Sequence, residues 1–198
     1  MDTTILTHIL STEEREAFEQ DGFLLVRNAL DSDLHQRLID VVDRVEKRER
    51  RAEHGNRLLS ITDVVHEDPS MVELVDNPHV FPKLWSILGW NIYLYHSHLD
   101  VTPSENADDQ PWNVAWHQDS MRVNDEIESN PRPRLSVKIG YYLTDVSQPD
   151  QGNTLVLPGS HLDNQLDCPN DGISNPEGAI PVCVNAGDAV ILDRRVWH

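Results

Sequence analysis

The chain of 198 residues carries 34 acidic side chains against 16 Lys and Arg, a formal net charge of −18. This surplus argues against partners that present a nucleic-acid backbone or an anionic membrane surface, and no apolar run approaches the roughly 20 residues of a membrane span. The two cysteines, Cys168 and Cys183, are too few for a disulfide framework, which favours a reducing cytoplasm.

Helical patterns dominate the first 89 residues. Ser11 followed by Glu14 is a capping box, and Asp31 and the pair Asp68-Pro69 are typical of further helix starts. In chain order we expect a helix from 11 to about 21, a buried strand at 23–26, a helix after Asp31 whose charged far end at 46–53 projects into solvent, and helices at 69–75 and 82–88.

From Trp90 onward the pattern changes to strands rich in β-branched and aromatic residues. Helices followed by a run of strands favour a single domain, 1–198, in which helices pack outside an all-β sandwich or barrel. The polar segment 163–178 predicts a long surface loop. The expected strands are 91–101, 112–119, 135–144, 154–157, 179–184 and 189–197.

One short motif in this half suggests metal chemistry. His117 and Asp119 lie two residues apart at the end of a predicted strand, so their side chains share a face while Gln118 points to the other side. One further imidazole would complete the two-histidine, one-carboxylate set that binds oxygen-activating iron(II). His198, at the end of the last predicted strand, is the candidate.

Spacing alone leaves other interpretations open. A His-x-Asp pair is more often a histidine hydrogen-bonded to a nearby acid than a metal site, and His161 is more typical of a turn than of a ligand. Two histidines and a carboxylate also suit zinc in a metal-dependent hydrolase.

Larger blocks of sequence decide between these interpretations. The blocks are Ala17–Phe23, Trp116–Asp119, Tyr142–Asp145 with Gly152–His161, and Gly187–His198. In this order, over nearly the whole chain, they resemble the phytanoyl-CoA dioxygenase superfamily of iron(II)/2-oxoglutarate-dependent oxygenases, which includes ectoine hydroxylase.

The resemblance implies a fold and a reaction. The fold is a double-stranded β-helix (jelly roll) with α-helices packed outside. The metal is Fe(II), held by His117, Asp119 and His198, and the co-substrates are 2-oxoglutarate and O2. The expected activity is that of a dioxygenase that hydroxylates or otherwise oxidises a small organic substrate, with succinate and CO2 as co-products.

Further contacts follow from the same resemblance. Tyr141 falls where relatives place an aromatic residue beside 2-oxoglutarate, and its alternation with Val137 and Ile139 is consistent with an inward face. Gln118 lies within the ligand motif and is a candidate for co-substrate binding, although its alternation turns it from the metal.

The strand expected at 91–101 is a second candidate for ligand contacts. His96, His98 and Thr102 alternate onto one face of it, together with Asp100. The resemblance assigns substrate contacts to His96 and co-substrate contacts to His98 and Thr102, although Thr102 replaces a lysine of the family. A hydrogen-bonded interior pair of histidines is the alternative.

The substrate is less well defined by the sequence. Arg122, Arg132 and Arg134 are candidates to anchor an anionic substrate, with Arg122 the nearest to the ligand motif, and solvated loop charges are the alternative. A chain this acidic does not favour a CoA thioester, and a small natural product or amino-acid-like molecule is expected.

Three rival functions share this fold. A halogenase would need the carboxylate position vacated, and Asp119 is present. A metal-dependent hydrolase or isomerase on a cupin-like barrel would keep the ligands without using 2-oxoglutarate. A non-catalytic binding member would tolerate a broken triad.

The family also closes its 2-oxoglutarate pocket with an arginine about ten residues beyond the distal histidine, where a bidentate Arg–carboxylate pair forms. The sequence stops at His198, so we expect it to be an incomplete record of a longer protein that carries this arginine and the last strands.

Overall fold

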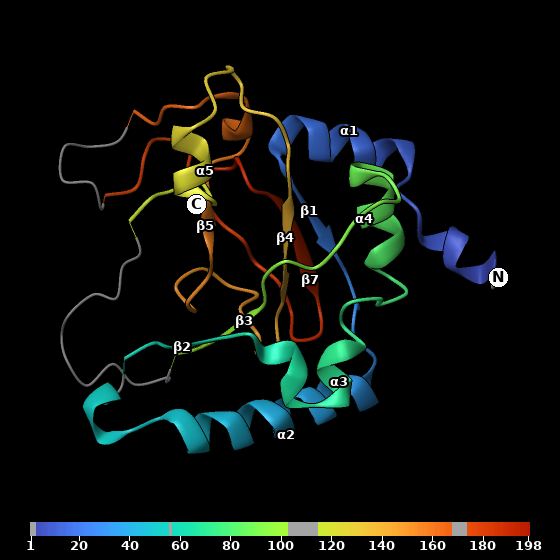
Figure 1. The fold of residues 1–198 in the computed structure, drawn as a ribbon, viewed down its shortest axis with the longest axis vertical. Helices are drawn as coiled ribbons and strands as arrows, with labels where there is room; N and C mark the ends of the chain where they lie inside the picture. The colour runs from blue at the N-terminus through green and yellow to red at the C-terminus, as the bar shows by residue number, and fades with distance from the viewer. Residues whose placement is uncertain (1–2, 56, 103–114, 168–173) are drawn as a thin grey trace.

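The computed structural model describes residues 3–55, 57–102, 115–167 and 174–198, with a central sheet flanked by helices (Figure 1). The helices are η1 (Thr3–His8), α1 (Thr12–Asp21), α2 (Ser32–Glu49), η2 (Ala52–His54), η3 (Val64–Glu67), α3 (Pro69–Val72), α4 (Phe81–Leu88), α5 (Met121–Asp125) and η4 (Ser160–Leu162). The strands are β1 (Phe23–Val26), β2 (Leu59–Thr62), β3 (His98–Val101), β4 (Val137–Tyr141), β5 (Leu155–Val156), β6 (Ile180–Pro181) and β7 (Ala189–Asp193).

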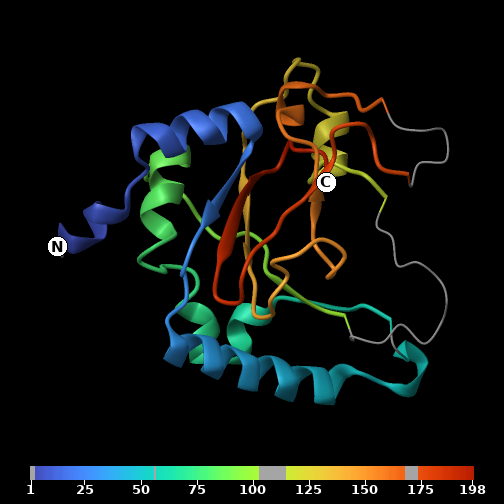
Figure 2. The same cartoon turned by 180° about the vertical axis from the view of Figure 1, so that it is seen from behind.

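The central sheet has the strand order β1-β7-β4, and β7 pairs antiparallel with both neighbours. All five residues of β7 are buried because strands flank both of its edges and apolar side chains cover both of its faces. On the first face, Leu24, Ala189 and Ile191 pack with Phe18 of α1 and with Leu84 of α4. The two helices lie side by side in both views (Figures 1 and 2).

The second face of the sheet carries a separate core. Val190 and Leu192 of β7 pack there with Phe23 and Leu25 of β1 and with Val156 of β5, which pairs with β6. Alternate residues of each central strand therefore belong to different cores. This alternation decides which side chains of the sheet can approach the candidate site.

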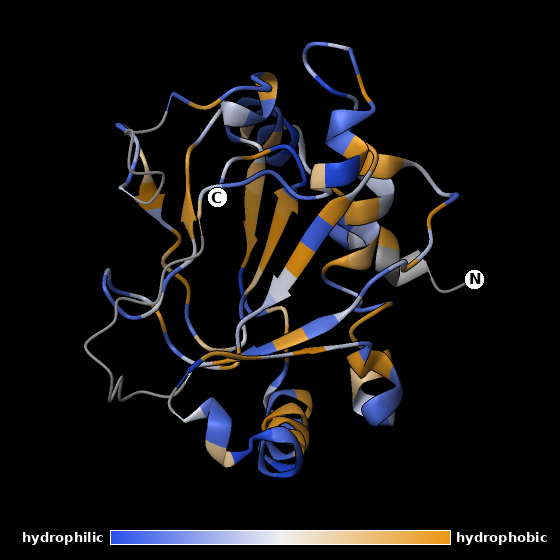
Figure 3. Ribbon diagram, turned by 60° about the vertical axis from the view of Figure 1, so that its left-hand side comes forward, coloured by the Kyte–Doolittle hydropathy of each residue, from blue (hydrophilic) through white to orange (hydrophobic). Residues whose placement is uncertain are grey.

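The N-terminal helices begin as predicted. The Ser11 hydroxyl accepts from the backbone N–H of Glu14, whose carboxylate accepts from the Ser11 N–H, both at 3.1 Å. Asp31 caps α2 by accepting from the Leu34 N–H at 2.8 Å. Figure 3 shows hydrophobic residues gathered on the central strands and on one side of α2. The buried stripe of α2 consists of Leu34, Leu38, Val41 and Val45.

The charged far end of α2 is largely exposed, as predicted, but its charges are paired with neighbouring segments. Arg48 pairs with Glu67 at 2.6 Å. The guanidinium of Arg50 donates to the carbonyls of Gly55 and Arg57, at 3.0 and 2.9 Å. The helix stops at Glu49, and the chain after it folds back along these contacts.

The strand prediction was correct in part. Within 91–101 only β3 is extended, and its partner β2 was not predicted. Residues 115–119 form no regular strand, and 112–114 lie outside the described residues, as do Cys168 and part of the expected loop 163–178.

Helix α3 ends at Val72, earlier than expected. The sheets with helices outside confirm that part of the predicted fold. No helix among the described residues is long and apolar enough to cross a membrane.

Gly22 generates a prediction on stability. Gly22 ends α1 with φ 82°, and an added Cβ would collide with the Val196 side chain and come within 2.6 Å of Nδ1 of His161. Gly22→Ala should lower the free energy of unfolding by about 3 kcal/mol, from left-handed strain and overpacking together. Gly152, with φ 85° and nothing within 4 Å of an added Cβ, is the matched control. Gly152→Ala should cost only about 1 kcal/mol, and equal losses in urea unfolding would contradict the packing argument.

Candidate metal centre

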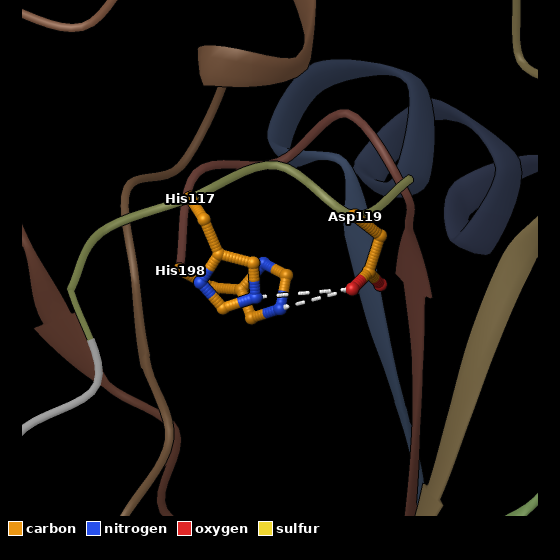
Figure 4. Close-up of side chains that lie close together, drawn as sticks. All are labelled: His117, Asp119 and His198. Carbon is orange, nitrogen blue, oxygen red and sulfur yellow. Dashed lines mark ion pairs between the residues drawn. The ribbon is translucent and has the colours of Figure 1, made fainter. Parts of the chain in front are cut away.

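Two segments far apart in the sequence meet at the candidate site. His117 and His198 exchange backbone hydrogen bonds, N–H of His117 to O of His198 at 3.0 Å and N–H of His198 to O of His117 at 3.1 Å. The N–H of Asp119 donates to the carbonyl of Arg194 at 2.9 Å. The segment before α5 is thereby aligned with the segment that follows β7, and the three predicted ligands converge (Figure 4).

The side chains of the triad are close without touching. Nε2 of His117 lies 3.8 Å and Nε2 of His198 lies 3.9 Å from Oδ1 of Asp119. The two imidazole centroids are 4.4 Å apart. Among the described residues, these three form the one group of histidine, cysteine or acidic side chains whose ligand atoms all lie within 4.8 Å of one another.

Both imidazoles are oriented by the backbone. Nδ1 of His117 bonds to the carbonyl of Ala115 at 3.0 Å, and Nδ1 of His198 bonds to the carbonyl of Val196 at 2.9 Å. Because a carbonyl can only accept, each Nδ1 is the donor, and Nε2 of each ring is turned toward the centre. Burial, followed by the charge of Lys138, lowers the pKa of His198 to about 4. His198 is therefore neutral near pH 7, as a metal ligand must be.

A lysine that the sequence analysis did not identify lies at the centre. Nζ of Lys138, on β4, is 2.8 Å from Oδ1 of Asp119 and 3.2 Å from Nε2 of His198. Side chains alternate between the two faces of β4, so Lys138 lies on the face opposite Tyr141. The triad approaches this face of the strand. The signal that could have found it is a cationic residue within an otherwise apolar strand.

Gln118 is buried behind the ligands, on the side that its alternation predicts. Its amide Nε2 donates to the carbonyls of Arg195 and Asp163, at 2.6 and 3.0 Å, and its Oε1 accepts from Arg132 at 2.9 Å. The side chain therefore joins the two ligand-bearing segments. None of these contacts is to the triad's open side, so co-substrate binding by Gln118 stays a prediction.

A buried ionic cluster holds the turn before His198. The carboxylate of Asp193 is fully buried and binds Arg195 and Arg134, both at 2.6 Å. Arg194 is also buried and donates to Oδ1 of Asn124 at 2.6 Å. Burial alone would raise the pKa of Asp193, but the hydrogen bonds from Arg195 and Arg134 together outweigh it and hold that pKa below its usual value.

Two loop arginines therefore have a role that neither sequence-based alternative anticipated. Arg134 pairs with Asp193 and, through its other nitrogens, with Glu19 of α1 at 2.8 Å. Arg132 donates to Gln118 and to the carbonyl of Asn124. They are neither solvated loop charges nor free anchors for an anion, whereas Arg122 is exposed on α5.

The inward orientation expected for Tyr141 needs correction. Tyr141, with Val137 and Ile139, packs on the helix-covered first face of the sheet, and its hydroxyl donates to the carbonyl of Leu74 at 2.8 Å. Burial raises the pKa of the phenol. Alternation correctly grouped Tyr141, Val137 and Ile139 on one face of β4, but it could not tell which face is turned toward the triad. The face turned toward the triad is the opposite one, which carries Lys138.

The structure brings His96, His98 and Asp100 together and does not bring them into the triad. The rings of His96 and His98 stack at 5.3 Å, and Nε2 of His98 lies 3.4 Å from Asp100. A hydrogen bond from His98 is the main cause that lowers the pKa of Asp100, and the charge of Lys138 adds to it. Thr102 is exposed. Ligand binding by His96, His98 and Thr102 stays a prediction.

His161 lies in a turn, as expected, and not in the ligand set. It is buried in η4, where Nε2 bonds to the carbonyl of Glu19 at 3.1 Å and Nδ1 has no hydrogen-bond partner. Burial lowers the pKa of His161. The turn also supports the distal ligand, because the hydroxyl of Ser160 accepts from the N–H of Trp197 at 2.9 Å.

The donor set fits a divalent metal ion. Two imidazole Nε2 atoms and one carboxylate oxygen face a common point, and three protein ligands leave further coordination positions for other ligands. This set defines a mononuclear metal centre of the two-histidine, one-carboxylate class, in which iron(II) is the usual metal of oxygenases and zinc that of hydrolases.

Comparison with known proteins identifies the family. The family model described as "Phytanoyl-CoA dioxygenase (PhyH)" matches residues 18–198. The chain belongs to the phytanoyl-CoA dioxygenase (PhyH) family. The family prediction from the sequence blocks is thereby confirmed.

Individual relatives are more distant. The ectoine dioxygenase of Bordetella parapertussis is 27% identical over 162 residues, which cover 77% of this chain and 50% of that protein. The ectoine dioxygenase of Streptomyces avermitilis is 24% identical over 160 residues, which cover 77% of this chain and 52% of that protein. The chain spans about half the length of the curated relatives it matches.

Solved structures share the fold. EctD from S. alaskensis with bound Fe superposes with a TM-score of 0.73 at 18% identity, covering 96% of this chain and 70% of that one. The non-heme alpha ketoglutarate dependent carbocyclase SnoK from nogalamycin biosynthesis superposes with a TM-score of 0.70 at 19% identity, covering 95% of this chain and 76% of that one.

The hydrogen bonds of Gln118 predict a structural effect of its removal. Gln118→Leu leaves the buried carbonyl of Arg195 without its donor and should lower the free energy of unfolding by about 1–3 kcal/mol. Gln36→Leu, on the exposed side of α2, is the control and should change it by less than about 0.5 kcal/mol. Chemical denaturation measures both. If Gln118→Leu were as stable as the parent and only bound 2-oxoglutarate more weakly, its assignment to the co-substrate would be favoured.

The burial of His161 predicts a pH dependence. Because the folded-state pKa is lowered, the unfolded chain takes up the proton first as the pH falls below about 6.5, and stability declines with falling pH. His161→Gln retains a donor for the carbonyl of Glu19 but does not titrate. The variant should therefore lose less stability than the parent between about pH 6.5 and pH 5. Parallel stability curves for the two proteins would contradict the prediction.

Proposed function

We propose that this protein is an iron(II)- and 2-oxoglutarate-dependent dioxygenase that hydroxylates a small organic substrate, on a jelly-roll domain with helices outside. The observation that carries the proposal is the convergence of His117, Asp119 and His198, with both Nε2 atoms and one carboxylate oxygen facing a common point. Membership of the PhyH family and the likeness to structures named for iron or alpha-ketoglutarate dependence support it.

The chain's own contribution is placement of the ligands. When bound, iron(II) with 2-oxoglutarate supplies the activation of O2, with succinate and CO2 as co-products. His198 is almost fully buried, at 7% side-chain exposure, whereas His117 and Asp119 keep 29% and 20%. The centre is therefore sealed on the side of the sheet and open toward solvent. The backbone bonds at each Nδ1 prevent the imidazoles from rotating away.

The substrate class follows from the family and from charge. The relatives named ectoine dioxygenase carry the name of a small molecule, and we propose a small organic substrate for this chain. A net charge of −18 does not favour a large polyanionic substrate. Asp119 at the carboxylate position favours hydroxylation over halogenation, which would require that position for a halide.

The triad generates the direct prediction for this function. His117→Ala, Asp119→Ala and His198→Ala should each abolish turnover and weaken iron(II) binding, because each removes one of three ligands. Anaerobic titration with iron(II) and then 2-oxoglutarate, followed by absorption spectroscopy, measures binding. The cores described above are untouched, so the variants should remain folded. His66→Ala, beside acidic residues on the surface, is the matched control and should bind as the parent does.

Reaction type is tested on the same samples. With substrate present, succinate formation should match 2-oxoglutarate consumption, and label from ¹⁸O2 should enter the product. Turnover with zinc under argon would contradict the proposal and favour a hydrolase, whereas full iron affinity in Asp119→Ala would show that the triad is assigned wrongly.

A further inference from the structure

Lys138 places a positive charge on the atoms that would bind the metal. Of the described residues, it is the one Lys or Arg whose charged group bonds to the carboxylate of Asp119, at 2.8 Å from Oδ1. We propose that Lys138 is a competing cation: it holds Asp119 in the metal-free protein, leaves when the metal binds, and then pairs with a carboxylate of the co-substrate beside the metal. The inference rests on the proposed function, since it assumes a metal at the triad.

Competition follows from which oxygen the lysine occupies. Oδ1 of Asp119 is the oxygen that faces Nε2 of both histidines. The ammonium bonds to this same oxygen and lies 3.2 Å from Nε2 of His198. A metal ion would take these atoms at about 2.0–2.2 Å. An ammonium and a dication cannot share one carboxylate oxygen and one imidazole lone pair at this range, so the lysine must move.

The lysine has room to move and a reason to stay nearby. Its side chain is 35% exposed, so the ammonium can leave Asp119 toward solvent. The four-carbon stem of lysine is flexible. A displaced ammonium therefore stays anchored on β4 beside the metal.

Three arginines of the region are already engaged. Arg134 and Arg195 are bound to Asp193, and Arg132 is bound to Gln118. Lys138 is the group that metal binding releases, so it becomes available for an anion only when the metal is present. Metal and carboxylate binding should therefore reinforce each other through this one side chain.

The experiment compares the parent with Lys138→Met and Lys138→Gln, which remove the charge. Isothermal titration with Ni(II) measures metal affinity without co-substrate, and a second titration adds 2-oxoglutarate to the Ni(II)-loaded protein. Lys47→Met, on the exposed side of α2, is the matched control. Both Lys138 variants should bind Ni(II) about three- to tenfold more tightly and 2-oxoglutarate about tenfold more weakly than the parent.

A third titration uses 2-oxovalerate, which keeps the metal-chelating group of 2-oxoglutarate but lacks its far carboxylate. If the Lys138 variants lose affinity for 2-oxoglutarate alone, Lys138 pairs with the far carboxylate. If they lose affinity for both 2-oxoglutarate and 2-oxovalerate, Lys138 pairs with the metal-bound carboxylate. Unchanged Ni(II) affinity in the Lys138 variants, or unchanged affinity for both oxoacids, would overturn the inference while the proposed function stands. If the parent protein binds Ni(II) no more tightly than Asp119→Ala does, no metal binds at the triad. That result would overturn the proposed function instead.

Discussion

The paired backbone hydrogen bonds between His117 and His198 are the contact on which the candidate centre depends. They join two segments that the sequence keeps far apart, and they fix the backbone of both histidines at once. The side chains then need only a local contact each, from Nδ1 to a carbonyl two residues earlier, to direct both Nε2 atoms at Asp119. A ligand set placed by backbone contacts is preorganised before any metal arrives, which lowers the cost of forming the site.

Buried charges maintain that pairing at an energetic cost. Asp193 ends the fully buried strand β7, and the desolvation of its carboxylate is offset by Arg134 and Arg195. Removing one member of such a cluster leaves a buried charge uncompensated, which is far more costly than the net stability of the pair. The cluster therefore specifies one conformation for the turn that carries His198. Gln118 extends it to the other ligand segment through the carbonyl of Arg195.

Local signals predicted the parts of this molecule that local interactions form. The capping box at Ser11 and the cap at Asp31 start helices where expected, because a cap is satisfied within one turn. The ligand motif was predictable for a similar reason, since two residues of separation place His117 and Asp119 on one side of the backbone. Other features depend on tertiary contacts. The pairing of β2 with β3 joins segments with no shared pattern.

The errors at the site share one cause. Alternation groups residues by face but carries no information on which face a second layer will cover, so Tyr141 was placed with the ligands and Lys138 was not identified. The loop arginines were likewise assigned to solvent or substrate because their partners, Asp193 and Gln118, come from distant segments. The role of a charged side chain in a loop can be assigned only when its contacts in the folded chain are known.

The proposed function requires that one metal ion binds between two imidazole Nε2 atoms and the carboxylate of Asp119. A crystal structure of the protein loaded anaerobically with iron(II), with anomalous data collected at the iron edge, tests it most directly. We expect one strong anomalous peak coordinated by His117, Asp119 and His198, with the ammonium of Lys138 displaced from Oδ1. A peak elsewhere, or none with Lys138 still bound to Asp119, would contradict it.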